Sequence, residues 1–171
     1  MMARTLFLLP VLGLIALLVV AAGRLPADVC LLQGQSSLAV LTEGQLPSPQ
    51  GLQRAFSTRQ CAARYGRPAR AQAERGLVHL ALIDQAGLGS VAAEAHANLG
   101  ASALRTALAR APLDPLAWTA LAYMEAVLGH DDAARAALAA ADQVAPYLPD
   151  IQDLRERTET LLNEAALSPA I

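Results

Sequence analysis

Three histidines are the first candidates for chemistry, because imidazole can act as a base or bind a metal near neutral pH. His79, His96 and His130 each stand alone, with no second His or Glu four residues away. That spacing would place two ligands on one face of a helix, as a helical metal site requires. His130 is followed by Asp131 and Asp132, but side chains of adjacent residues diverge. A capped turn is therefore favoured over a cation site.

Motifs for other reactions are also missing from the sequence. There is no G-x-S-x-G nucleophile elbow. There is no glycine-rich loop of the kind that binds phosphate groups. We therefore expect a protein that is not an enzyme and that has no catalytic residues, no cofactor and no metal.

The two cysteines, Cys30 and Cys61, suggest a different kind of chemistry. They form no C-x-x-C or C-x-x-C-H motif, so redox, haem-attachment and zinc signatures are missing. In an exported chain two cysteines most often pair, and closing a loop of this length is worth about 3–4 kcal/mol. The alternative is two unpaired thiols that pack as small apolar residues.

The start of the chain bears on that choice. Residues 5–23, TLFLLPVLGLIALLVVAAG, carry no charge and lie between Arg4 and Arg24. The stretch is long enough to cross a hydrocarbon core of roughly 30 Å as a helix. We expect a single-pass anchor in a bacterial inner membrane, with residues 1–4 cytoplasmic and the remainder periplasmic. The alternative is a cleaved secretory signal with its small-residue site at 21–23.

Charge is unevenly distributed along the chain. The net charge of −2 argues against a dedicated nucleic-acid binder. A basic cluster is opposed nearby only by Glu74, whereas residues 111–171 are acidic. The cluster can meet anionic lipid headgroups or an acidic partner, or it can neutralise the acidic C-terminal half. Its arginines are Arg54, Arg59, Arg64, Arg67, Arg70 and Arg75.

The remainder of the chain predicts a linker followed by helices. Residues 24–49 contain Gly and Pro among short apolar pairs, which is typical of a linker. Ser48 and Pro49 then provide a cap and first turn for a helix at about 50–65. We expect the domain 50–171 to be all-α.

Further helix boundaries follow from turn residues. Apolar residues recur at helical spacing from Pro68 until Gly87 and Gly89. Ser90 can cap the next helix, which ends before Pro112, and Asp114 can cap a helix that starts at Pro115. Residues 149–165 predict a terminal helix with one apolar face and a charged face exposed to solvent.

Residues 115–148 carry a recurring pattern of large and small side chains. The positions that define it are Trp118, Leu121, Gly129, Ala134, Leu138, Ala141 and Pro146. This segment resembles one unit of the tetratricopeptide repeat family, a helix-turn-helix of about 34 residues. It departs from the family pattern at Ala122, Glu125 and Leu138. Ala107 and Pro112 precede Ala141 and Pro146 by one repeat length, which extends the resemblance upstream.

The resemblance implies a fold and a class of function. The fold expected is an N-terminal transmembrane helix followed by a short stack of antiparallel helical hairpins. Repeats of this family are mostly protein-binding scaffolds, so we expect a non-catalytic scaffold or accessory protein in an envelope complex for assembly, secretion or polysaccharide export. The alternative is a small structural subunit of a membrane enzyme or transporter. Candidate partner-binding residues are Trp118, Glu125, Arg64, Arg67 and Arg70.

Overall fold

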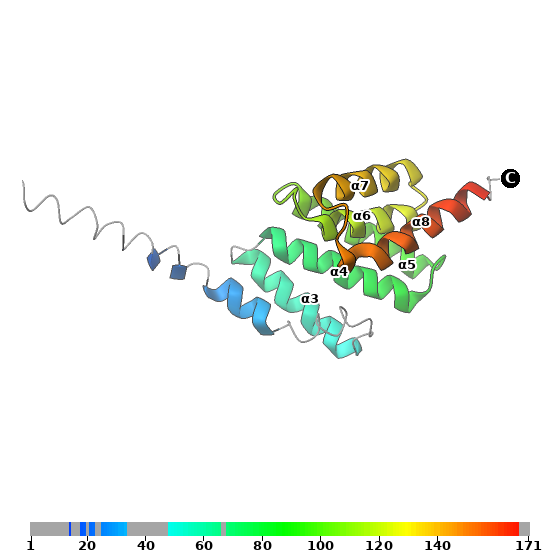
Figure 1. The fold of residues 1–171 in the computed structure, drawn as a ribbon. Helices are drawn as coiled ribbons and strands as arrows, with labels where there is room; N and C mark the ends of the chain where they lie inside the picture. Colours follow the sequence, from blue (N-terminus) through cyan, green and yellow to red (C-terminus); the bar gives the residue numbers. More distant parts are fainter. Residues whose placement is uncertain are drawn as a thin grey trace, which may run out of the picture.

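The computed structural model describes residues 14, 18–19, 21–22, 25–33, 48–65 and 68–167. Residues 25–33 are helical. The later elements are α3 (Pro49–Arg64), α4 (Pro68–Ala86), α5 (Val91–Leu108), α6 (Pro115–Val127), α7 (Asp131–Val144), the 3-10 helix η1 (Pro149–Ile151) and α8 (Gln152–Leu167) (Figure 1). No strand occurs among the described residues, so the all-α expectation is confirmed for them.

Three of these helices begin at the residues that the sequence predicts, because a side chain caps the first turn of each. The side chain of Ser48 accepts a hydrogen bond from the backbone N–H of Gly51 at 3.2 Å. Ser90 caps α5 and Asp114 caps α6 in the same way, at 3.1 and 3.0 Å. Each cap satisfies a backbone donor that the first turn of a helix leaves unpaired. Short connections then return the chain against the preceding helix.

Each helix from α3 to α7 packs against the next, and α6 is the central element. It contacts α4, α5, α7, η1 and α8, with α8 lying across it (Figure 1). Side chains on every face of α6 are therefore buried, including Thr119, Tyr123 and Glu125. The main apolar core lies among α4, α5 and α6 and continues to Leu154 of α8.

Glycines permit two close contacts within this core. A Cβ atom on Gly76 of α4 would lie 2.4 Å from the Cγ atom of Leu104 in α5. A Cβ atom on Gly100 of α5 would lie 2.3 Å from the sulfur of Met124 in α6. Non-bonded carbon atoms prefer separations of about 3.5–4.0 Å, so these helices approach to distances that only glycine allows.

The hairpin of α4 and α5 is longer than the hairpin of α6 and α7, but small residues lie at matching positions in their second helices. Helices α4 and α5 have 19 and 18 residues, whereas α6 and α7 have 13 and 14. Small buried residues nevertheless recur 34 positions apart in α5 and α7. The equivalent pairs are Gly100 and Ala134, Ala103 and Ala137, and Ala107 and Ala141.

Part of the predicted linker is structured. Residues 25–33 were interpreted as linker but form a helix in which Ala27 and Leu31 are buried. Leu31 packs with Ala62 of α3 and Ala71 of α4. These contacts are tertiary, which explains why a Gly- and Pro-containing composition did not reveal them.

The expected anchor lies mostly outside the described residues. Within 5–23 the structure describes 14, 18–19 and 21–22, whose side chains are exposed. No helix formed by the described part of the chain is long and apolar enough to cross a membrane. The anchor therefore stays a prediction from the sequence.

Candidate functional site

Glu125 is the most enclosed of the candidate residues. It is 2 % exposed, although it stands where the repeat pattern has an aromatic residue. Its carboxylate pairs with the guanidinium of Arg105 in α5, and its second oxygen lies 2.9 Å from Nδ1 of His130. Glu125 therefore joins α5, α6 and the following turn, and its contacts are internal.

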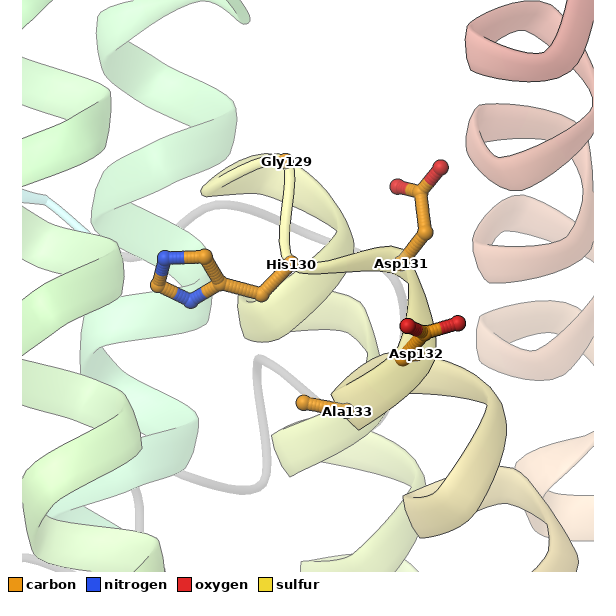
Figure 2. A pocket seen from close by; sticks show the side chains of 5 residues that line it. All are labelled: Gly129, His130, Asp131, Asp132 and Ala133. Atoms are coloured by element: carbon orange, nitrogen blue, oxygen red, sulfur yellow. The ribbon is translucent and has the colours of Figure 1, made fainter.

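The turn after α6 forms a shallow hollow lined by Gly129, His130, Asp131, Asp132 and Ala133. Gly129 has φ +72°, a backbone conformation that side-chain-bearing residues rarely adopt. Figure 2 shows the His130 ring pointing away from the two aspartates, which lie on the other side of the turn. The three side chains do not converge on one point, which is the divergence expected for adjacent residues.

Two histidines that stand far apart in the sequence meet in the core. His79 of α4 and His96 of α5 place their Nδ1 atoms 3.4 Å apart, and the edge of Phe56 in α3 contacts His79. Burial, followed by the charges of His96 and Arg75, lowers the pKa of His79 to about 4. His79 is therefore neutral at physiological pH, and the nearby Arg75 guanidinium disfavours a bound cation.

A polar network joins α4, α6 and α8. Arg157 of α8 donates to the hydroxyl of Tyr123 at 2.9 Å and pairs with Asp84 of α4. Its guanidinium also lies over the Tyr123 ring, 4.8 Å from the centroid. Burial raises the pKa of Tyr123, and the Arg157 charge opposes that rise. Arg157 was expected on a solvent-exposed charged face, and instead its charge is turned towards α4 and α6.

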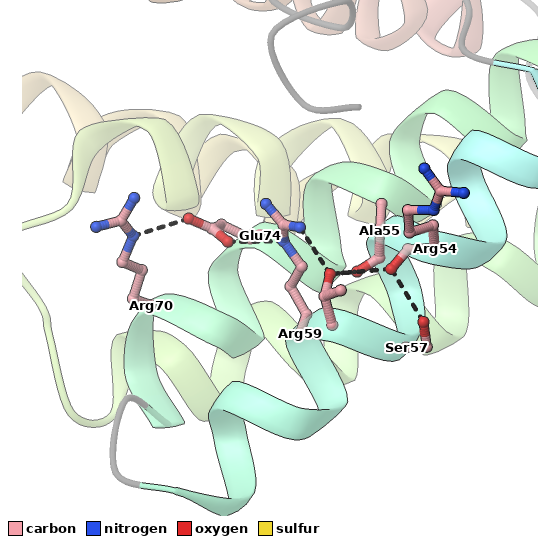
Figure 3. A network of polar contacts seen from close by, with 7 residues as sticks. Arg54, Ala55, Ser57, Arg59, Arg70 and Glu74 are labelled. Carbon is pink, nitrogen blue, oxygen red and sulfur yellow. Dashed lines mark hydrogen bonds and ion pairs between the residues drawn. The ribbon is translucent and has the colours of Figure 1, made fainter. Parts of the chain in front are cut away.

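Three arginines of the basic cluster, Arg59, Arg70 and Arg75, have local partners. Arg59 is 1 % exposed and donates to Glu74 at 2.8 Å, and Arg70 donates to the other oxygen of the same carboxylate (Figure 3). Arg59 also donates to the hydroxyl of Thr58. Arg75 lies over the Phe56 ring. These arginines are thus held by α3 and α4 themselves and not by the acidic C-terminal half.

Two of the candidate arginines remain accessible at the α3–α4 end. Arg64 is exposed, and the Arg70 side chain is 64 % exposed despite its ion pair. Arg67 lies outside the described residues. The disulfide between Cys30 and Cys61, with Cα atoms 5.9 Å apart, ties the 25–33 helix to this end of α3.

Trp118 belongs to the margin of the core. Its side chain packs against the central apolar cluster, and its indole N–H donates to the carbonyl of Pro112 at 2.8 Å. Trp118 and Glu125 lie in α6, whereas Arg64 and Arg70 lie at the junction of α3 and α4. The four candidate residues that the structure describes are therefore not gathered into one surface.

Exposed apolar side chains mark another region that the sequence reading did not single out. Leu113, in the connection after α5, is 79 % exposed, and Tyr147, in the connection after α7, is 90 % exposed. They are 34 residues apart and so occupy equivalent places in the two hairpins. The repeat spacing was the signal that could have identified them.

Neither a metal site in the part of the chain that the structure describes nor a known relative indicates a function for this chain. Among the described residues, no three His, Cys, Asp or Glu side chains gather as a metal site would need. The chain matches no family model, no curated protein and no solved structure.

Proposed function

We propose that the chain is a membrane-anchored scaffold whose helical domain binds another protein of the bacterial cell envelope in the periplasm. The observation that carries the proposal is the recurrence of small buried residues 34 positions apart in α5 and α7. In tetratricopeptide-like hairpins, residues of this size let the second helix lie close against the first.

The neighbours of each helix support a stack of hairpins. Helix α6 lies against α4 of the preceding hairpin and against α8 of the following segment. Each hairpin of a repeat protein buries its apolar face against the next one, and a terminal helix with a polar outer face closes the stack. Helix α8 suits that role because Leu154 and Leu162 are buried while Glu156 and Glu164 are exposed.

We assign to the partner the edge formed by two connections, the one between α5 and α6 and the one between α7 and η1. Leu113 and Tyr147 repeat there as large exposed apolar side chains. Aromatic and aliphatic side chains of this kind serve as anchors in protein interfaces. Trp118 and Glu125 contribute by holding α6 in place.

The proposed location rests on two features near the start of the chain. The uncharged stretch 5–23 is long enough for a membrane anchor. The disulfide between Cys30 and Cys61 is of a kind that persists in oxidising compartments such as the periplasm.

Affinity purification tests the proposal. The full chain would carry a C-terminal tag and be recovered from detergent-solubilised membranes, with mass spectrometry of the proteins that accompany it. A single exported envelope protein, recovered in constant ratio to the chain, supports a scaffold. Recovery of all subunits of one membrane enzyme or transporter favours the structural-subunit alternative. Recovery of the chain by itself from membranes would contradict both.

A further inference from the structure

The 25–33 helix has two apolar faces, and only one is covered by the domain. Ala27 and Leu31 are buried, but Leu25, Val29 and Leu32 are 61, 50 and 66 % exposed. Positions 25, 29 and 32 recur at the spacing of one helix face, so the three side chains form a continuous stripe. Residues 25–33 follow Arg24, which closes the uncharged stretch 5–23.

Basic and aromatic side chains flank the same helix. Cys30 is bonded to Cys61, which lies three residues before Arg64, the last residue of α3, and four before Tyr65, its C-cap. Tyr65 is 48 % exposed. Arg70 stands beside Ala71, which packs with Leu31. In Figure 1 the 25–33 helix, in blue, lies beside α3 on the side of the molecule away from α7.

We propose that this end of the domain rests on the periplasmic surface of the bilayer and binds anionic lipid headgroups. Leu25, Val29 and Leu32 enter the boundary of the acyl chains, while Arg64 and Arg70 meet lipid phosphates. Tyr65 lies at the headgroup level, where tyrosine is enriched in membrane proteins. The inference rests on the proposed membrane anchor and adds a second contact that fixes how the domain is oriented.

Charge and continuity favour a lipid surface over a second copy of the chain. An apolar stripe flanked by arginines matches the layered chemistry of an anionic membrane interface. Two copies joined through this face would bring the same exposed arginines towards each other, which like charges disfavour. The stripe also continues the apolar character of the predicted anchor into the domain.

Tryptophan fluorescence in the full chain provides the test. Trp118→Phe removes the single native tryptophan, and a new one is placed at Val29, at Tyr65 or, as a control, at Tyr147. Tyr147 is 90 % exposed in the connection that follows α7, far along the stack from α3. Each protein is reconstituted into vesicles of phosphatidylcholine, with or without about a third phosphatidylglycerol, that carry brominated acyl chains. Flotation of the vesicles is measured in parallel, and circular dichroism verifies folding.

We expect brominated lipid to quench Val29→Trp and Tyr65→Trp at least twofold more strongly than Tyr147→Trp. We also expect quenching of Tyr65→Trp to be stronger with phosphatidylglycerol, and Arg64→Gln with Arg70→Gln to remove that difference. Protein that floats with the vesicles while both probes stay unquenched overturns the lipid contact and leaves the anchor intact. Burial of the stripe by a second copy of the chain would give this same result. Protein that does not float contradicts the anchor itself. Quenching that is equal on both lipids overturns the headgroup assignment.

Discussion

Gly76→Ala probes the close approach of α4 and α5. The added Cβ atom would lie 2.4, 2.6 and 3.1 Å from the Cγ, Cδ2 and Cδ1 atoms of Leu104. All three atoms at the branched end of the Leu104 side chain would therefore lie too close to the added Cβ atom. Leu104 is fully buried in the apolar core among α4, α5 and α6. The helices must separate, or the side chain must leave its preferred rotamer.

Two opposing effects set the size of the change. Overpacking of a filled core costs about 1–3 kcal/mol. Replacing Gly by Ala inside a helix gains about 1 kcal/mol of helix propensity. Because a branched carbon and not a flexible chain end is displaced, we expect the packing cost to exceed the gain. The free energy of unfolding should therefore fall, by up to about 2 kcal/mol.

A double-mutant cycle isolates this contact. Leu104→Ala alone should cost about 2–5 kcal/mol, because it leaves a cavity. Combined with Gly76→Ala, the new methyl group enters the vacated space, so the double variant should be more stable than the sum of the two changes by about 1–3 kcal/mol. Urea unfolding of a fragment from residue 25, which retains the disulfide, gives all four values. An increase of about 1 kcal/mol for Gly76→Ala, with no coupling to Leu104, would refute the close approach of α4 and α5.

Four further outcomes follow from the structure and the sequence. Ala134→Leu, at a fully buried position, should cost about 1–3 kcal/mol, while Ala136→Leu, at an exposed position of the same helix, should change the melting temperature little; equal losses would mean that α7 is phased differently. The lowered pKa of His79 means that the unfolded chain binds its proton first, so stability should fall by about 3 kcal/mol as pH falls from 6.5 to 4 and level off below; urea unfolding of His79→Gln should lack this contribution, and an unchanged slope would refute it. Denatured, unreduced protein should show no thiol with a thiol reagent, whereas two titratable thiols would contradict the disulfide. Alkaline phosphatase fused after Ile171 should be active, and an inactive fusion alongside a fluorescent cytoplasmic one would contradict export.

Helix starts could be predicted because their causes are local. Ser48, Ser90 and Asp114 each precede their helices by one residue, and their caps bond to backbone groups three residues away. Such short-range chemistry can be read directly from the sequence. Gly87 and Gly129 also mark turns for a local reason, since both adopt positive φ.

The polar clusters could not be predicted in this way, because their partners come from neighbouring helices. His79 and His96 lie nearly equidistant from the Gly87–Gly89 turn, and only an antiparallel hairpin brings them together. Arg59 and Glu74 are likewise equidistant from the connection between α3 and α4. The pattern within each single helix therefore does not reveal these pairs. They form only when neighbouring helices pack antiparallel.

Burial was the other property that the sequence concealed. The arginine cluster was expected to meet lipid, an acidic partner or the acidic C-terminal half, yet Arg59 is among the most buried side chains of the described residues. Glu125 was expected to bind a partner, and its carboxylate is enclosed by Arg105 and His130. Charged groups can be buried where they are paired, and the pairing depends on tertiary structure.

The most direct test of the account is photo-crosslinking in intact cells. A photo-reactive amino acid replaces Leu113 or Tyr147, and Ala136, which is exposed on α7, serves as the matched control position. Both edge positions should crosslink to one and the same exported envelope protein, and the control position should not. Crosslinks of equal yield at all three positions, or none at Leu113 and Tyr147, would contradict a protein-binding role for this edge of the hairpin stack.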